Sequence, residues 1–312
     1  MCALLVSVIT LSGAANRSFR TEMEQWNPIG FTQAQSGPQT TNRLTAGSAI
    51  LPTVATAAPS GVLRGGSANV ITFTTLQKSG ESVKLKMTYT GSLSLDGLTG
   101  TPKSGEWSTY TLTSQTVTIR GDVTGFYCSY NQLKALDVSQ NTALTRLYCG
   151  SNALTALDVS KNTALTHLYC DWNPLTTLDV SQNTALTELE CVNNLLTALD
   201  ISKNTALTTL DCYNNQLTAL DVSKNTALTW LFCYNNQLTA LDVSKNTELE
   251  ILRCFGNQIK GEEMTRLVKS LPDRTGKAAR EFIVVQEPAP EGNRCLKTDV
   301  AIAKGKNWIV KV

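Results

Sequence analysis

The sequence predicts a β-rich solenoid, a fold in which one short unit is repeated along an elongated core. Seven of the nine cysteines lie 21 residues apart without a slip, and the residues around each cysteine repeat with it. Self-similarity at a fixed period of about 20 to 50 residues is typical of stacked repeats. The seven cysteines are Cys128, Cys149, Cys170, Cys191, Cys212, Cys233 and Cys254.

The first half of each copy predicts a short strand followed by a bend. In the copy that begins at Leu144, Leu147 and Cys149 are two positions apart. On a strand they would point to the same face, and Tyr148 would point to the other. Asn152 recurs in all seven copies. A buried asparagine can bond backbone groups that a tight bend leaves unpaired, in its own coil and in the next one.

The second half of each copy repeats the first in a shorter form. Leu154, Leu157, Val159 and Asn162 follow the same spacing of apolar residues and asparagine. About ten residues leave no room for a helix of average length, which is about 11 to 12 residues, together with two turns. We therefore expect an extended or 3₁₀ back to each coil and one parallel sheet at the front. Strands about 4.8 Å apart would make that sheet on the order of 30 Å long.

The repeated cysteines are interpreted as free thiols that pack in the core, since free cysteine behaves as a small buried hydrophobe. Side chains in register lie one strand spacing apart, which is wider than a relaxed disulfide prefers. A straight row of thiols cannot surround a metal ion, and no CxxC motif or nearby histidine supplies other ligands. We expect no metal and no cofactor.

The N-terminal 61 residues precede the patterned part of the chain. Residues 1–15 are apolar but too short to span a bilayer. They are similar to the hydrophobic part of a secretory signal, although the usual positive charge is missing. Residues 16–61 are rich in Thr, Gln, Ser, Ala, Gly and Pro, which is typical of a disordered linker. The sequence therefore predicts export without membrane insertion.

Residues 62–122 predict an N-terminal β-strand cap for the first coil of the seven repeats at 123–259, because a solenoid needs a cap at each end. Alternating apolar and polar residues indicate short strands. These runs lie at 71–73, 83–87, 93–95, 110–112 and 117–119.

Residues 260–312 predict a C-terminal βα cap. Met264, Leu267, Val268 and Leu271 follow the spacing of an amphipathic helix that a proline ends. A strand at 282–285, a short helix at 298–304 and a strand at 308–310 are expected after it.

The repeated motif LxxLxCxxNxL resembles the leucine-rich repeat, with cysteine where the third strand leucine usually stands. The full copy, NTALTxLxCxxNxLTALDVSK, is similar to the 21-residue repeats of internalin-like surface proteins of Bacteroidetes, over about residues 62–312. The resemblance implies an exported bacterial protein, associated with the outer membrane, that acts in adhesion and cell–cell contact.

The outward positions on the strand side vary from copy to copy, whereas the back of the coil hardly changes. Drift after duplication would have scattered both sides, so the variable side predicts a recognition surface on the concave face. It is rich in aromatic residues, which are enriched at binding hot spots. The predicted ligand-binding residues are Tyr127, Tyr148, Tyr169, Trp172, Tyr213, Trp230, Phe232, Tyr234, Arg253 and Phe255.

The charges do not suit a nucleic acid. The net charge is +2, and the strand side carries both signs with no basic stripe. Catalysis is not expected either. His167 is the one histidine of the chain, and no GxSxG, HExxH or phosphate-binding loop is present.

The leading hypothesis is a secreted or cell-surface binding protein that engages a protein on a host or neighbouring cell. A carbohydrate-binding module is an alternative, because aromatic platforms also stack on sugars. A structural spacer of a truncated surface protein is the other. The sequence predicts no particular oligomeric state.

Overall fold

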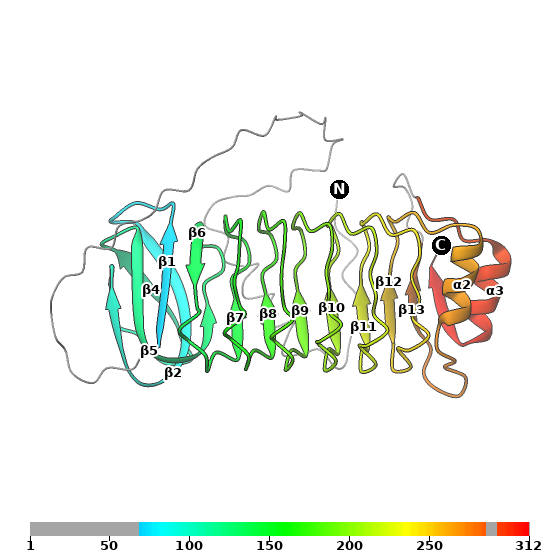
Figure 1. Cartoon of the computed structure of the whole chain (residues 1–312), viewed down its shortest axis with the longest axis horizontal. Coiled ribbons are helices and arrows are strands. Elements are labelled where there is room, and N and C mark those ends of the chain that lie inside the picture. Colours follow the sequence, from blue (N-terminus) through cyan, green and yellow to red (C-terminus); the bar gives the residue numbers. More distant parts are fainter. Residues whose placement is uncertain (1–68, 285–291, 312) are drawn as a thin grey trace, which may run out of the picture. The chain divides into compact units, whose positions relative to one another are not determined.

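The computed structural model describes residues 69–284 and 292–311, so the signal-like segment 1–15 and the linker 16–61 lie outside the described residues. Within the described part, one 14-stranded sheet runs through the repeats and the segments on both sides of them (Figure 1). The strands that precede the row of repeats, and β6 in the first coil, are β1 (Val70–Thr75), β2 (Ser82–Asp96), β3 (Leu98–Thr99), β4 (Trp107–Leu112), β5 (Thr116–Tyr127) and β6 (Leu133–Asp137).

Six three-residue strands of the repeats pair with one another in parallel, with a constant register of 21 residues. Each has a fully buried leucine at its centre and side chains on the outer face at its two ends. These strands are β7 (Arg146–Tyr148), β8 (His167–Tyr169), β9 (Glu188–Glu190), β10 (Thr209–Asp211), β11 (Trp230–Phe232) and β12 (Ile251–Arg253).

The back of each coil is made of turns. Residues 149–250, all of which the structure describes, contain no helix. Two turns close the back, for example where Asn162 N–H donates to Val159 O at 2.9 Å and Leu165 N–H to Asn162 O at 3.0 Å. The predicted β-solenoid with a helix-free back is therefore confirmed.

The repeated cysteines line the core beside the strand leucines. All seven are free and fully buried. Burial raises the pKa of the six thiols from Cys128 to Cys233, that of Cys233 to about 12 from an ordinary 9.0, because a thiolate would lose its hydration in the apolar core. The thiols are therefore neutral and act as apolar filling.

A first row of buried asparagines ties each bend to the preceding coil. Asn194 Nδ2 donates to Cys191 O and Cys170 O, both at 3.1 Å, and its Oδ1 accepts Leu175 N–H at 3.1 Å. The same bonds recur at Asn152, Asn173, Asn215, Asn236 and Asn257. One side chain thus satisfies backbone groups of two coils, as the sequence predicts.

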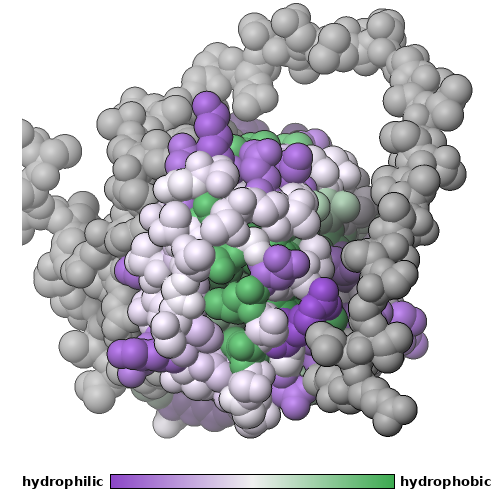
Figure 2. Space-filling view, turned by 90° about the vertical axis from the view of Figure 1, so that its left-hand side faces the viewer, coloured by the Kyte–Doolittle hydropathy of each residue, from purple (hydrophilic) through white to green (hydrophobic). Residues whose placement is uncertain are grey.

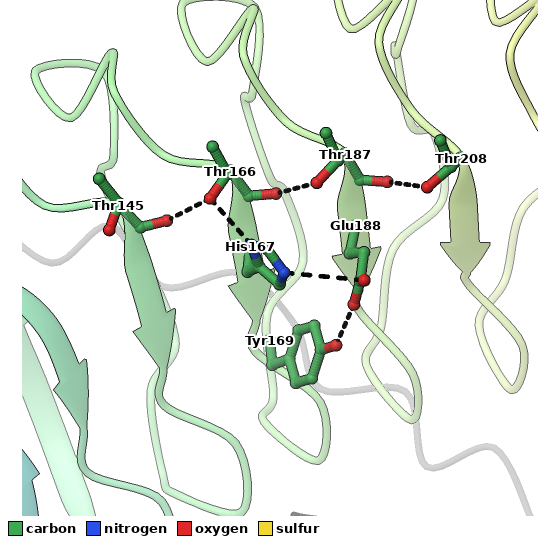
Figure 3. Close-up of polar contacts among 7 residues, drawn as sticks. All are labelled: Thr145, Thr166, His167, Tyr169, Thr187, Glu188 and Thr208. Atoms are coloured by element: carbon green, nitrogen blue, oxygen red, sulfur yellow. Dashed lines mark hydrogen bonds and ion pairs between the residues drawn. The ribbon is translucent and has the colours of Figure 1, made fainter. Parts of the chain in front are cut away.

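A second asparagine row and a threonine row repeat the principle elsewhere in the coil. Asn183 Nδ2 donates to Val159 O and Asn162 O, both at 2.9 Å. Just before each of the strands β7 to β11, a threonine hydroxyl donates to the carbonyl of the equivalent threonine one coil earlier (Figure 3). The distance from Thr187 Oγ1 to Thr166 O is 3.1 Å. Each coil is therefore held to its neighbour by side chains as well as by strand pairing.

The N-terminal strands join the repeats through β5. This strand pairs antiparallel with β1 and β2 and parallel with β7. Asn131 begins the first asparagine row, since its amide exchanges two bonds of 2.9 Å with the backbone of Lys84 on β2. Figure 2 shows this end of the described chain, where neutral and polar residues surround a central apolar patch.

The C-terminal segment continues the sheet by two parallel strands, each following a helix. The predicted amphipathic helix is present, with Met264, Leu267, Val268 and Leu271 all buried. Asn293 ends the first asparagine row, because its Oδ1 accepts Ile259 N–H at 2.8 Å. The elements are α2 (Glu262–Ser270), β13 (Arg280–Ile283), α3 (Lys297–Gly305) and β14 (Trp308–Lys311).

Replacing Asn194 by alanine should destabilise the solenoid strongly. The substitution leaves Leu175 N–H without its acceptor and removes one of the two amides that donate to each of the carbonyls of Cys170 and Cys191. A buried unsatisfied group costs about 1–3 kcal/mol and a lost hydrogen bond about 1 kcal/mol, so a loss of roughly 3 kcal/mol is expected in chemical denaturation. Gln216→Ala, at an exposed bend position, is the matched control and should change the free energy of unfolding by less than about 0.5 kcal/mol.

Alkaline pH should unfold the protein through the buried thiols. Their pKa is higher in the folded state than in the unfolded state, so the folded state keeps protons that the unfolded state loses above pH 9.0. Each thiol then lowers the free energy of unfolding by up to about 1.4 kcal/mol per pH unit. Chemical denaturation at a series of pH values above 9.0 should show that the free energy of unfolding falls less steeply with pH in Cys233→Ala than in the wild type. Equal slopes would contradict a raised pKa of the Cys233 thiol.

Candidate functional site

The outward side chains of the parallel strands, with those that follow the cysteines, form one surface, called here the strand face. The register places equivalent residues of successive coils side by side, so this surface consists of three rows. The first row is Gly125, Arg146, His167, Glu188, Thr209, Trp230 and Ile251; the second is Tyr127, Tyr148, Tyr169, Glu190, Asp211, Phe232 and Arg253; the third is Ser129, Gly150, Asp171, Val192, Tyr213, Tyr234 and Phe255.

Three tyrosines predicted to be exposed are buried. Tyr127 is 8% exposed, and Tyr148 and Tyr169 are each 7% exposed. Their ring centroids are 4.6 Å apart for the first pair and 4.3 Å for the second. Lys86 Nζ lies 5.2 Å from the ring centroid of Tyr127, which is also an edge contact for Trp107. The prediction of exposure is wrong here, because neighbouring rings in register cover one another.

A half-exposed group of five aromatic side chains lies at the C-terminal end of the strand face, and we call it the aromatic cluster. Its third-row members are stacked, with centroids 4.1 and 4.4 Å apart and interplanar angles of 11° and 14°. Arg253 Cζ lies 5.0 Å from the centroid of Phe232, and its guanidinium is 3.5 Å from Glu281. The cluster consists of Tyr213, Trp230, Phe232, Tyr234 and Phe255.

Four carboxylates occupy the middle of the strand face and are called here the acidic centre: Asp171, Glu188, Glu190 and Asp211. Three of them lie close enough to the buried thiol of Cys191 to act on it. Burial raises the pKa of that thiol most, and the negative charges of Asp211, Glu190 and Asp171 raise it further. The middle of the face is therefore electronegative, with Arg146 on one side and Arg253 on the other.

His167 contacts the acidic centre (Figure 3). Its Nδ1 is 2.8 Å from Thr166 Oγ1, and that hydroxyl donates to Thr145 O, so Nδ1 carries the hydrogen. Its Nε2 lies 3.7 Å from Glu188 Oε1, and the other oxygen of Glu188 accepts the Tyr169 hydroxyl. Protonation of Nε2 would create an ion pair with Glu188.

The pKa of His167 is nevertheless below its ordinary 6.5. Burial lowers it most, Glu188 raises it and Arg146 lowers it. The imidazole is therefore neutral at pH 7. Burial also raises the pKa of the Cys170 thiol well above 9.0, so this cysteine is protonated there as well.

Trp172 occupies a bend position where its backbone is left-handed, with φ of 52°. The other six copies hold asparagine three times and glycine, serine and tyrosine once each at this position: Asn193, Asn214, Asn235, Gly256, Ser151 and Tyr130. Asparagine and glycine suit that conformation, whereas a bulky residue in it costs roughly 1 kcal/mol. The side chain is nevertheless 56% exposed, so packing does not explain why tryptophan stands here.

Pro174 and Leu195 extend the apolar surface beside Trp172, and the predicted site did not include them. Both are exposed, Leu195 to 44%. They hold equivalent positions in successive coils, joined where Leu195 N–H donates to Leu175 O at 2.8 Å. Four other copies have glutamine at this position: Gln132, Gln216, Gln237 and Gln258. Comparison of the copies at this position would have found the exception.

The repeated aspartates on the back are turn residues. Asp158 Oδ1 accepts Ser160 N–H at 2.8 Å, and the same bond recurs at Asp137, Asp179, Asp200, Asp221 and Asp242. This backbone bond is the main reason that the pKa of Asp158 is lowered. Across the residues with described positions, no group of three His, Cys, Asp or Glu side chains is arranged to hold a metal ion. No helix in this part of the chain is long and apolar enough to cross a bilayer.

The titration of His167 tests this geometry. Glu188→Gln should lower the pKa of the imidazole further, because the carboxylate stabilises the imidazolium, and Arg146→Gln should raise it. NMR titration of the imidazole protons measures both shifts, and the chain's one histidine makes the assignment unambiguous. An unchanged pKa in Glu188→Gln would show that the two side chains do not interact in solution.

Among known proteins, the chain is similar to solved structures only in part of its length. No family model and no curated protein matches the chain. The functional domain of InlJ from Listeria monocytogenes, which includes a cysteine ladder, is 36% identical over 52% of this chain and 39% of that one, with a TM-score of 0.40. A leucine-rich-repeat protein of Leptospira interrogans is 24% identical over 57% of this chain and 46% of that one, with a TM-score of 0.46.

Internalin C2 from Listeria monocytogenes is 20% identical over 61% of this chain and 80% of that chain, with a TM-score of 0.51. This chain spans less than half of the length of the first two structures. The Bacteroidetes origin stays a prediction, since these proteins come from other bacteria. Together with the 21-residue register of the parallel strands, the match to internalin C2 shows that the chain has the leucine-rich-repeat solenoid fold.

Proposed function

We propose that this chain is a secreted or cell-surface binding protein whose strand face engages a protein on a host or neighbouring cell. The observation that carries the proposal is the contrast between the two sides of the coil. On the back, the constant aspartates and asparagines each make the same backbone hydrogen bond in successive coils, so the fold itself explains why they do not vary. On the strand face the outward residues differ from coil to coil.

The aromatic cluster is the part of the strand face best suited to a protein partner. Its five side chains are half-exposed and adjacent. At the edge of the cluster, the guanidinium of Arg253 lies over the ring of Phe232. Aromatic residues and arginine are enriched in the cores of protein interfaces, where burial of large rigid side chains provides much of the affinity. The curvature expected of a stacked solenoid would present them on a concave surface.

The stacking of the cluster favours a protein over a sugar. Carbohydrates pack on the open faces of aromatic rings. The faces of Tyr234 are covered on both sides, by Tyr213 and Phe255, and the edges are left for contact. Edges and hydroxyls suit the mixed apolar and polar groups of a protein surface.

Export of the chain is supported by the apolar segment at residues 1–15, which has the composition of a signal h-region. The internalins, with which the chain shares its fold, support a role at the cell surface as analogy only.

A cell-binding assay tests the function. Trp230→Ala combined with Tyr213→Ala should weaken binding of the purified chain to its target cells by at least about 30-fold, since truncation of a single hot-spot aromatic residue costs about 2 kcal/mol or more. Protease treatment of the cells should abolish binding, whereas enzymatic removal of glycans should not. Flow cytometry with labelled protein measures all three.

Thr226→Ala, on the exposed back of the coil that contains Tyr213, is the matched control and should bind as the wild type does. Circular dichroism establishes that both variants are folded. Binding that survives protease but not glycan removal would favour the carbohydrate alternative. Unchanged binding by the folded double variant would favour the spacer.

A further inference from the structure

The chain departs from its own consensus at three exposed positions that lie together, and we call them the apolar edge: Trp172, Pro174 and Leu195. They belong to two successive coils. Two backbone hydrogen bonds join these coils at the apolar edge. Trp172 N–H donates to Val192 O, and Leu195 N–H donates to Leu175 O, both at 2.8 Å. In these two coils, exposed apolar residues therefore stand where most copies have polar ones, whereas Tyr130 and Ala153, the other apolar or aromatic residues at these positions, are only partly exposed.

Two features show that the fold does not need this replacement. At the bend position, asparagines form an amide row of their own, in which Asn214 Nδ2 donates to Asn193 Oδ1 at 2.8 Å and Asn235 Nδ2 to Asn214 Oδ1 at 2.7 Å. Trp172 stands where the next amide of this row would be, in a left-handed conformation that disfavours it. Strained residues that packing does not require are concentrated at functional sites.

The charge beside the apolar edge indicates what could cover it. Asp171 precedes Trp172 in the chain, and Glu190 and Asp211 lie in the next two coils of the strand face. All three act on the Cys191 thiol, which places their charges in one small region. A positively charged group on a partner would be attracted to these carboxylates. Burial of the apolar edge would offset the entropy that the partner loses on binding.

We propose that the apolar edge and the acidic centre together receive one segment of the protein partner, in which a lysine or arginine lies next to an aromatic or aliphatic residue. This inference rests on the proposed function and names the chemistry of its partner. The basic side chain lies against Asp171 and Glu190, and the apolar side chain packs on Trp172 and Leu195. The four residues that contact this segment lie in the coils of β8 and β9, whereas the aromatic cluster lies further along the sheet in the coils of β10 to β12.

Phage-displayed random dodecapeptides, selected on the immobilised chain, provide the probe. Peptides that bind the wild type but not Trp172→Asn should carry a basic residue beside an aromatic or aliphatic one. A synthetic peptide of this kind should bind about tenfold more weakly to Trp172→Asn and to Glu190→Gln, as isothermal calorimetry would measure. Its affinity should also fall as the salt concentration rises.

Trp172→Asn has a second expected outcome that a structural role would not produce. The new amide can extend the asparagine row, so the melting temperature should be equal to or higher than that of the wild type by about 2 °C. Ser151→Asn changes the equivalent residue one coil earlier, which is also left-handed, and should leave peptide affinity unchanged. Leu195→Gln, which restores the consensus residue, tests the same edge should Trp172→Asn not fold.

Several results would overturn the inference. These are selected peptides that are acidic or uncharged, peptides that bind Trp172→Asn as well as the wild type, or a selection that yields no discriminating peptide. A concentration-dependent dimer that Trp172→Asn abolishes would assign the edge to a second copy of the chain instead. If the peptide site fails while the Trp230 and Tyr213 double variant still loses cell binding, the proposed function stands without it.

Discussion

The buried asparagine amide at each bend is the interaction on which the rest of the solenoid depends. A coil with no helix on its back has little regular backbone pairing, so its bends would leave N–H and C=O groups unpaired in the core. The amide of Asn194 resolves this for two coils at once, by accepting Leu175 N–H and donating to Cys170 O and Cys191 O. The leucines and cysteines can then be purely apolar. The outward side chains of the strands are not needed to satisfy these backbone groups, so they can differ from coil to coil.

Much of the fold follows from the sequence because its determinants are local and repeated. Leu147 and Cys149 share a face by strand alternation, and the short second half of each copy has no room for a helix. The amphipathic helix at Glu262–Ser270 is likewise specified by spacing within one segment. The continuation of the sheet through β13 and β14 is different, because it depends on pairing across a helix. Alternation within a segment carries no information about such partners.

The binding surface was less predictable, since exposure depends on neighbours in space. Tyr148 points outward as strand alternation requires, yet equivalent rings on both sides bury it. The position of Trp172 in the repeat was known, but its left-handed backbone could be inferred only by noting which residues the other copies place there. Leu195 was not predicted because leucine is common throughout the repeats and is usually buried there. Only comparison with the glutamines at the equivalent position of other coils shows that this leucine is unusual.

The direction of the asparagine row has a consequence for how such a chain can change in length. Each amide completes the bend of the coil before it. The row therefore starts at Asn131, which bonds the backbone of Lys84 on β2, and ends at Asn293, which completes the last bend. A whole number of 21-residue coils can therefore be inserted or deleted between these two ends while every interior bend keeps its amide. Unequal recombination in units of one coil would lengthen or shorten the strand face and would leave every interior bend hydrogen-bonded. The segments at the two ends are different, because a repeated coil cannot supply the bonds that they make.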